Sequence, residues 1–335
     1  MTQKKHDNSK TSKPQTWLIT GVGGFIGSNV ATFLLDRGQR VVGLDDFSAG
    51  KRENIKRIEK KHVNNFIFFE GSILSDEVLD ACCRQADVII HLAAQVSVAN
   101  SIENPMQNNE TNVTGFLCIL EAAVKSKAHA LIYASSCAVY GNSTELPIKE
   151  SHLPNPLSQY AVSKLVNEHY ASCYGKLYPE LKIVGLRFFN VFGPWQDAES
   201  GYAAVIPKWI NLLLNGERPV IYGDGNASRD FCFVDDVSSA IIKAADAEQF
   251  VSGNAYNICS GVEMRLDELF HKIHSALTAK GIQNLPGQPE LKNWRPGEIL
   301  NSLGDRQLSA RELGLSPPID FAVGLQKLLE EEHGL

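Results

Sequence analysis

The chain has 335 residues, of which 44% are hydrophobic and 21% charged, a composition typical of a globular protein with a sizeable core and unlike disordered or fibrous chains. Its 32 Lys and Arg against 38 Asp and Glu give a formal net charge of −6. Because no long basic run follows residue 13, nucleic-acid binding is not expected as the main function. At roughly 150 residues per domain, the length indicates about two domains.

Residues 1–15 are polar and have little to bury, so we predict a flexible tail there. The seven cysteines are scattered, with no CxxC pair and no histidine cluster at metal spacing. We therefore expect reduced thiols, a cytoplasmic location and no bound metal. No stretch approaches the roughly 18 uninterrupted apolar residues of a membrane span, so no membrane segment is expected.

From Thr16 onward, short apolar runs alternate with helical patterns. The runs are almost continuously apolar, as parallel strands buried on both faces must be. This alternation predicts an α/β fold with a Rossmann-like, doubly wound parallel sheet over residues 16–187. Predicted strands cover 16–20, 41–45, 66–70, 88–93, 130–135 and 182–187, and predicted helices cover 25–37, 75–84, 105–126 and 157–176.

After Arg187 the pattern changes to irregular stretches with turn signals and shorter helices. We predict a smaller C-terminal α/β lobe over 188–335 that binds the substrate, with some of its later segments returning to the first domain. Its predicted helices lie near 202–214, 235–246, 266–279 and 320–332.

A glycine cluster lies between the first predicted strand and the first predicted helix. Glycines at such a turn let the backbone approach a pyrophosphate at the helix N-terminus, where free N–H groups favour negative charge. A glycine turn by itself joins strands to helices in many proteins, so the motif needs support from elsewhere in the chain. Its residues are Gly21, Gly24, Phe25, Ile26 and Gly27.

That support comes from Asp45, at the end of the second predicted strand. A carboxylate at this place accepts hydrogen bonds from the hydroxyls of an adenosine ribose. The turn and the acid together predict a dinucleotide site. The acid favours NAD over NADP because it repels a 2′-phosphate. Lys51 and Arg52 follow closely, however, and their positive charge could attract such a phosphate.

Tyr160 and Lys164 are four residues apart in a predicted helix, which places the phenol and the ammonium on one face. A phenol with a reference pKa of about 10 is a poor base unless positive charge stabilises its anion. Ser136 follows the fifth predicted strand, at the edge where ligands of such sheets bind. The Tyr and Lys pattern alone describes an ordinary helix surface, but with the dinucleotide motif and Ser136 it predicts a proton-transfer site.

Several short motifs occur in a fixed order between residues 16 and 312. They are TGxxGxxG, HLAA at 91–94, NVTG at 112–115, SSCAVYG at 135–141, YxxxK and RFFNVFGP at 187–194. Together they resemble the extended short-chain dehydrogenase/reductases. Within these the chain is similar to the UDP-hexose 4-epimerases, particularly those that act on UDP-N-acetylglucosamine.

The resemblance implies an isomerase that holds NAD tightly, oxidises sugar C4 to a ketone and returns the hydride to the other face. Tyr160 would remove the C4 hydroxyl proton, Ser136 would bind the C4 oxygen, and Lys164 would bind the nicotinamide ribose and lower the pKa of Tyr160. The resemblance also implies a homodimer formed by helices around 105–126 and 157–176. Further implied cofactor contacts are Ser72, Ile73, Ala93 and Asn112.

The second half of the chain carries matches for a UDP-sugar. The resemblance places Ser302 at the position that walls the sugar pocket near C2, where a small residue would leave room for an N-acetyl group, and this predicts UDP-GlcNAc and UDP-GalNAc as substrates. An Arg229–Asp230 ion pair and a core position for Tyr222 are the plain alternatives. The implied contacts in this half are Ser302 at the sugar, Asn190, Arg229 and Arg295 at the diphosphate, Tyr222 at uracil and Glu298 at the ribose. In the first half, Ser97 is a further implied contact of the sugar.

Four positions depart from the family pattern. Ser72 stands where an acid usually contacts adenine, and Glu298 replaces the commoner Asp. Val96 and Ala138 stand where epimerases of N-acetylated sugars commonly carry Gly and Ser. UDP-glucose and UDP-glucuronate therefore stay open as substrates.

Related activities need other residues after the catalytic serine. A 4,6-dehydratase needs an Asp-Glu pair there and a decarboxylase needs Glu at position 138, and Cys137-Ala138 supplies neither. Cys137 keeps a GDP-sugar epimerase/reductase as an alternative. A non-catalytic NAD-binding protein is the alternative from another class, and the intact Ser136, Tyr160 and Lys164 count against it.

Overall fold

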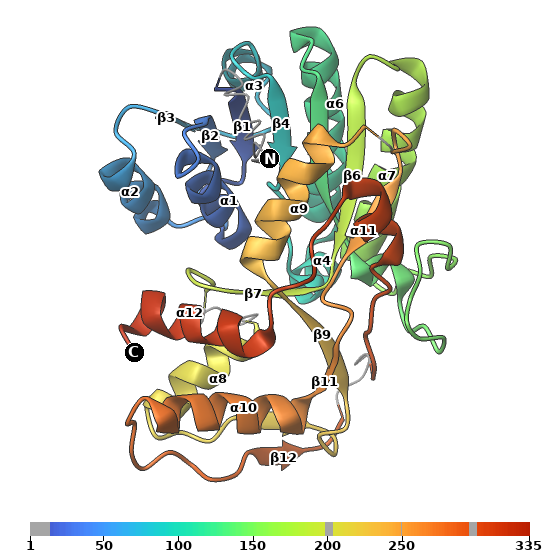
Figure 1. The fold of residues 1–335 in the computed structure, drawn as a ribbon. Helices are drawn as coiled ribbons and strands as arrows, with labels where there is room; N and C mark the ends of the chain where they lie inside the picture. Colours follow the sequence, from blue (N-terminus) through green and yellow to red (C-terminus); the bar gives the residue numbers. More distant parts are fainter. Residues whose placement is uncertain (1–13, 198–203, 249, 295–299) are drawn as a thin grey trace, which may run out of the picture.

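The computed structural model describes residues 14–197, 204–248, 250–294 and 300–335. Its central element is a seven-stranded sheet with the order β10-β6-β5-β4-β1-β2-β3, in which neighbouring strands run parallel (Figure 1). The predicted doubly wound parallel sheet is confirmed. Its strands are β1 (Thr16–Thr20), β2 (Arg40–Asp45), β3 (Phe66–Glu70), β4 (Val88–His91), β5 (Ala130–Ser136), β6 (Lys182–Phe188) and β10 (Ala255–Ile258).

Helices cover both faces of this sheet because consecutive strand residues point to opposite sides. Ile89 and Ile90 of β4 are both fully buried, each in a different apolar cluster. Helices α1 (Phe25–Leu35), α2 (Arg52–Lys61), α9 (Val234–Asp246) and α11 (Gln307–Leu313) contribute to one cluster, and α3 (Asp76–Cys83), α6 (Gly115–Ser126) and α7 (Gln159–Leu177) to the other.

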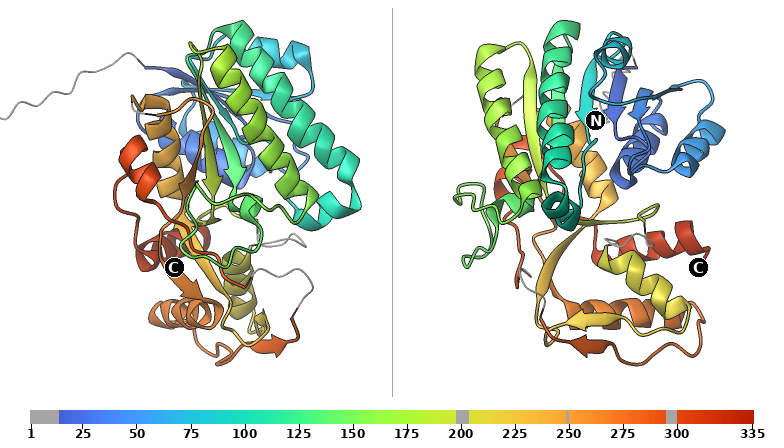
Figure 2. Two further views of the ribbon diagram at one scale, coloured as in Figure 1. Left: turned by 90° about the vertical axis from the view of Figure 1, so that its right-hand side faces the viewer. Right: turned by 180° about the vertical axis from the view of Figure 1, so that it is seen from behind.

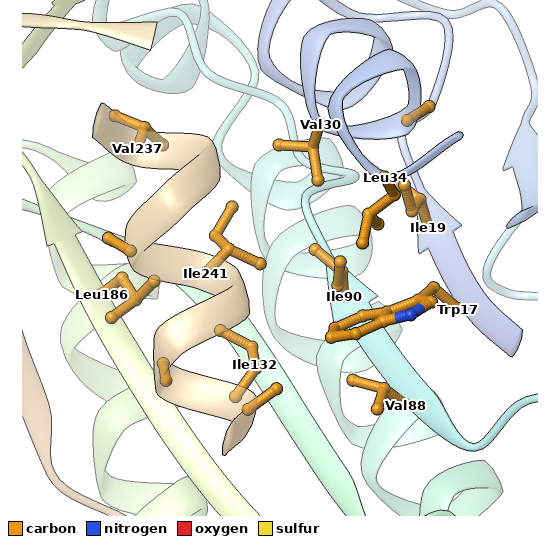
Figure 3. Close-up of a cluster of buried hydrophobic side chains, with 14 of the residues drawn as sticks. Trp17, Ile19, Val30, Leu34, Val88, Ile90, Ile132, Leu186, Val237 and Ile241 are labelled. Carbon is orange, nitrogen blue, oxygen red and sulfur yellow. The ribbon is translucent and has the colours of Figure 1, made fainter. Parts of the chain in front are cut away.

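Figure 3 shows the first of these clusters, where α1 and α9 pack over the strands. Val30 of α1 and Ile241 of α9 are fully buried against strand residues such as Ile19 and Ile90. Each such side chain contributes roughly 1.5–3 kcal/mol when fully buried. Strand β10 and helices α9 and α11 therefore pack with the main sheet although they lie beyond residue 187 in the sequence.

The remaining C-terminal elements form a smaller lobe, which the chain enters from the carboxyl end of β6 (Figures 1 and 2). It has its own core, in which Trp209, Phe270 and Phe192 are buried. A three-stranded sheet has the order β11-β9-β7, and β12 pairs with β8. The elements are β7 (Asn190–Phe192), α8 (Val205–Leu214), β8 (Val220–Tyr222), β9 (Ser228–Phe233), β11 (Glu263–Arg265), α10 (Leu266–Ala279), β12 (Glu290–Lys292) and α12 (Phe321–His333).

The structure differs from the predicted elements in a few places. The helix predicted over 105–126 is divided into α5 (Pro105–Asn109), a π-helical turn η1 (Glu110–Thr114) and α6. The π turn turns the buried Asn112 toward its partners, as described below. Strand β4 ends at His91 rather than at residue 93. Elements outside the predicted set include α2, α4 (Val98–Glu103), α11 and the 3₁₀ turn η2 (Cys137–Tyr140).

Two negative observations hold for the part of the chain that the structure describes. There, no helix is both long and apolar enough to cross a membrane. In the same ranges, His, Cys, Asp and Glu side chains form no group of three or more that could hold a metal ion.

Candidate active site

The glycine turn after β1 is closely packed. Gly21 has a φ of +73°, and a Cβ there would lie 2.7 Å from the backbone nitrogen of Ala93. A Cβ on Gly27 would lie only 2.1 Å from the carbonyl oxygen of Gly21. The first helical hydrogen bond of α1 runs from Ser28 N to Gly24 O at 3.0 Å. The N–H groups of residues 25–27 come before this bond and point out of the N-terminus of the helix. This turn fits a pyrophosphate, which needs close backbone approach and free amides.

Asp45 lies beside this turn and is almost fully buried. Its Oδ2 accepts a hydrogen bond from Gly23 N and its Oδ1 accepts one from Phe47 N, both at 2.8 Å. Burial raises the pKa of Asp45, and the two backbone donors oppose that rise. A Cβ on Gly50 would lie 2.6 Å from Oδ1, so this glycine leaves room for the carboxylate. The carboxylate is held in one orientation, suited to accept ribose hydroxyls.

Three of the other predicted cofactor residues also lie along the carboxyl edge of the sheet. Ser72 follows β3, and its hydroxyl accepts a hydrogen bond from Leu74 N at 3.2 Å. Ile73 is buried, and a Cβ on Gly115 would lie 2.5 Å from its Cδ1. Ala93 follows β4 and faces Gly21. They therefore lie at the carboxyl ends of β3 and β4. In the sheet, these two strands stand on opposite sides of β1, the strand that the glycine turn follows.

Asn112 is buried and fully used in hydrogen bonds within the protein. Its Oδ1 accepts from Gln95 N at 2.8 Å, and its Nδ2 lies 2.9 Å from Gln95 O, 3.0 Å from Asn108 Oδ1 and 3.1 Å from Ser163 Oγ. The side chain thus joins the loop after β4 to Ser163 of α7, the residue before Lys164. The structure gives Asn112 a positioning role, and its predicted contact with the cofactor stays a prediction.

Ser136, Tyr160 and Lys164 are brought together where β5 ends against α7. The hydroxyl of Ser136 caps η2 by accepting from Ala138 N at 3.1 Å, and it shares a hydrogen bond with the Tyr160 phenol. The Nζ of Lys164 lies 5.8 Å from the centroid of the Tyr160 ring and donates to Ala134 O at 2.9 Å. The three predicted catalytic residues therefore form one cluster.

Burial sets the acid–base properties of this cluster. It raises the pKa of Tyr160 to about 12, and the hydrogen bond with Ser136 opposes that rise. It also lowers the pKa of the Lys164 ammonium to about 8. A phenol with such a pKa needs nearby positive charge to act as a base at neutral pH.

A buried polar network that the sequence motifs did not identify joins α7 to strands β5 and β6. Glu168, one turn after Lys164, accepts from Arg187 at 2.7 and 2.9 Å and from the Ser135 hydroxyl at 2.5 Å. Arg187 also donates to the Tyr140 hydroxyl at 2.6 Å. An arginine at the end of an apolar strand, and an acid four residues after Lys164, were the available signals.

The C-terminal lobe contains a cavity of about 410 Å³. Asn190, Tyr222 and Arg229 line it together with Trp209 and Phe231, so the predicted uracil and diphosphate residues share one space. Tyr222 lines the cavity and is only partly buried, and its contact with uracil stays a prediction. Asn190 Nδ2 donates to Asp230 O at 3.2 Å, which ties β7 to β9.

Asp230 has a separate, structural role. Its carboxylate accepts from the backbone and hydroxyl of Ser260, both at 2.7 Å, from Gly261 N at 3.0 Å and from Gly304 N at 3.1 Å. Arg229, its neighbour along β9, donates from Nη1 to Ser228 O at 2.8 Å. Adjacent strand residues point to opposite faces, so the sequence adjacency of this pair does not produce the suggested ion pair.

Ser302 lies two residues before Gly304, whose backbone nitrogen donates to Asp230, and contacts the turn after β5. It is buried, its backbone nitrogen donates to Ser228 O at 3.1 Å, and its hydroxyl shares a hydrogen bond with the Cys137 thiol. Ser97 caps α4 by accepting from Asn100 N at 3.1 Å. The predicted contacts Arg295 and Glu298 lie outside the described residues.

Comparison with known proteins agrees with this geometry. The model of the NAD dependent epimerase/dehydratase family matches residues 17–259. A UDP-glucose 4-epimerase of Mycolicibacterium smegmatis is 35% identical over 315 residues, covering 93% of this chain and 97% of that protein.

Two solved structures are similar over nearly the whole chain. A UDP-N-acetylglucosamine 4-epimerase from Methanobrevibacter ruminantium M1, in complex with UDP-N-acetylmuramic acid, has a TM-score of 0.87 and 34% identity and covers 96% of this chain and 98% of its own. A UDP-glucose 4-epimerase from Thermotoga maritima with UDP-glucose has a TM-score of 0.85 and 32% identity and covers 94% and 98%. The glycine turn, Asp45, the Ser136, Tyr160 and Lys164 cluster and these likenesses lead to one assignment: the chain belongs to the NAD-dependent epimerase/dehydratase family.

Proposed function

We propose that the protein is an isomerase that inverts C4 of a UDP-sugar through a 4-keto intermediate. The observation that carries the proposal is the cluster of Ser136, Tyr160 and Lys164, which lies where β5 ends against α7. The similar proteins named as 4-epimerases of UDP-glucose and UDP-N-acetylglucosamine support it.

The residues around the glycine turn would hold NAD. When bound, NAD would accept and return a hydride, and its oxidised ring would supply positive charge that favours the Tyr160 phenolate. Asp45 would accept the adenosine ribose hydroxyls and Lys164 would bind the nicotinamide ribose. The other contacts would come from Gly21, Gly24, Phe25, Ile26, Gly27, Ser72, Ile73, Ala93 and Asn112.

Tyr160 would be the acid–base residue that transfers the proton. It would take the C4 hydroxyl proton as C4 is oxidised to a ketone, and would return that proton when the ketone is reduced on its opposite face. Ser136, which already shares a hydrogen bond with the phenol, would hold the C4 oxygen. The Lys164 ammonium would stabilise the phenolate, because positive charge opposes the effect of burial on the Tyr160 pKa.

The nucleotide would occupy the lobe cavity. Arg229 and Asn190 would bind the diphosphate, with Arg295 joining them, and Glu298 would contact the ribose. Tyr222 would stack on uracil, and the apolar walls from Trp209 and Leu212 suit a flat base.

For the sugar, we propose UDP-GlcNAc and UDP-GalNAc. Ser302 is small and sits against Cys137, next to the catalytic serine, which leaves volume beside the sugar for an N-acetyl group. Burial raises the pKa of Cys137 to about 12, so the thiol stays protonated at neutral pH and is not a nucleophile.

The test is incubation of the purified protein, without added cofactor, with UDP-GlcNAc, UDP-GalNAc, UDP-Glc, UDP-Gal and UDP-GlcA, with products identified by NMR. Interconversion of the acetylated pair is expected to be preferred. Ser302→Tyr is expected to abolish this activity by steric overlap while keeping activity on UDP-Glc and UDP-Gal. Activity of the wild type on UDP-Glc or UDP-GlcA alone contradicts the sugar assignment, and no activity on any of the five contradicts the epimerase.

We also propose a homodimer. Val162, Tyr170 and Leu177 are exposed and lie eight and seven residues apart on α7, along one helical stripe, and Val98 and Ile102 of α4 are exposed nearby. Burial of this stripe against a second copy would remove it from water. Light scattering after size exclusion is expected to give twice the chain mass, and Val162→Glu is expected to give the monomer. The same change at the exposed Val323 of α12 is the control. A monomeric wild type contradicts this proposal.

A further inference from the structure

Two acidic side chains end neighbouring strands at the carboxyl edge of the sheet. Asp45 is the last residue of β2 and Glu70 the last of β3, and the strand register pairs them directly. Asp45 is buried, whereas Glu70 is exposed. Besides Asp45 and its exposed neighbour Asp46, this edge of the sheet therefore carries the Glu70 carboxylate.

Two cations stand at the start of α2, on the same edge. Lys51 is its N-cap residue and Arg52 its first residue. Positive charge at a helix N-terminus is unfavourable to the helix dipole, so helix formation gives no reason for either residue. Both are paired with acids from other segments: Lys51 Nζ lies 2.8 Å from Asp197 Oδ1, and Arg52 is paired with Glu70.

The Arg52 pair has a defined geometry. Arg52 Nη1 donates to Glu70 Oε2 at 2.8 Å and Nη2 donates to Glu70 Oε1, so both ends of the guanidinium fork are engaged. The guanidinium carbon also lies 4.1 Å from the ring centroid of Phe47. Phe47 has a φ of +57° and donates its N–H to Asp45. Arg52 therefore packs on a residue that is itself hydrogen-bonded to the acid proposed to bind the adenosine ribose.

We propose that Glu70 is a cofactor-selectivity residue that acts with Asp45 against NADP. A 2′-phosphate carries about two negative charges, and dinucleotide sites that accept it use an arginine near the ribose. Glu70 instead binds the Arg52 guanidinium, which would otherwise be available to bind such a phosphate. The proposal rests on the placement of the adenosine ribose at Asp45.

Competition between the two dinucleotides tests the proposal. The full-length protein is equilibrated with an equimolar mixture of NAD and NADP, freed of unbound nucleotide and extracted, and the bound NADP to NAD ratio is measured by chromatography. Glu70→Gln is expected to raise this ratio by about fivefold or more. Glu59→Gln, which removes the same charge from an exposed position of α2, is expected to leave it unchanged.

A second variant separates release of Arg52 from loss of repulsion. In the double variant Arg52→Gln/Glu70→Gln, the ratio is expected to return to near the wild-type value, because no guanidinium is left to bind the phosphate. A gain that persists in the double variant, or no gain in Glu70→Gln, overturns the proposal. Wild-type protein that retains neither nucleotide would instead contradict the proposed NAD site itself.

Discussion

The carboxylate of Glu168 on α7 and the guanidinium of Arg187 on β6 form a buried, two-pronged ion pair, with Nη2 and Nε donating at 2.7 and 2.9 Å. Because Glu168 also accepts from the Ser135 hydroxyl, this pair joins the end of β5, where Ser136 lies, to the helix that carries Tyr160. It therefore links the two segments whose side chains, Ser136 and Tyr160, share a hydrogen bond.

Glu168→Gln is expected to lower kcat while the KM for the UDP-sugar changes little, because the catalytic groups shift and the nucleotide cavity does not. Breaking the buried pair is expected to cost about 3 kcal/mol in the free energy of unfolding, measured by urea denaturation. In a cycle with Arg187→Met, the double variant is expected to lose less stability than the sum of the single variants. Glu180→Gln, an exposed change of equal charge, serves as the control. An unchanged kcat in Glu168→Gln contradicts the positioning role.

Tyr160→Phe is expected to keep the fold and UDP-sugar binding but to lower turnover at least about 100-fold, the usual contribution of a positioned acid–base group. Tyr178→Phe removes the same hydroxyl from the C-terminal cap of the same helix and is expected to keep near wild-type turnover. Turnover follows from NMR of the two epimers. Full activity of Tyr160→Phe would falsify the proposed proton transfer.

The pH dependence of kcat/KM is expected to reflect Lys164, whose pKa burial lowers to about 8. Below that pH the group is protonated and favours the Tyr160 phenolate, and above it the charge is lost, so activity is expected to decline. In Lys164→Ala this declining limb is expected to disappear and the remaining activity to shift to higher pH, because the phenol has lost its cation. Identical profiles for the two proteins would show that the ammonium does not act on the phenol.

Asp45→Ala and Asp45→Asn are both expected to weaken NAD retention by at least about tenfold, the effect of a lost charged hydrogen bond. Asparagine is expected to be no better than alanine, because both carboxylate oxygens accept backbone N–H groups and an amide NH2 would face one of them. The retained NAD is measured after purification. Asp46→Asn, an exposed neighbour with the same charge loss, is the control, and equal retention in all the variants excludes Asp45 from the site.

The sheet was predictable because buried parallel strands have a local signature. The strand over 16–20 has its predicted bounds, and the strands over 40–45 and 182–188 deviate from theirs by one residue. Helix α2 was not predicted because most of its residues are charged and only Ile55 and Ile58 give it an apolar stripe. The family motifs were likewise local, and comparison confirms the family that they indicated.

By itself, the sequence determined the first six strands of the main sheet, the glycine turn with Asp45, and the spacing of Tyr160 and Lys164, because each depends on neighbours along the chain. Only the tertiary structure decided which acid takes Arg52, that Glu168 meets Arg187, and that Ser302 reaches Cys137. These contacts join segments far apart in the sequence. Hydrogen bonds and ion pairs require side chains to meet within about 3 Å in a given direction, and hydrophobic periodicity carries no information about that.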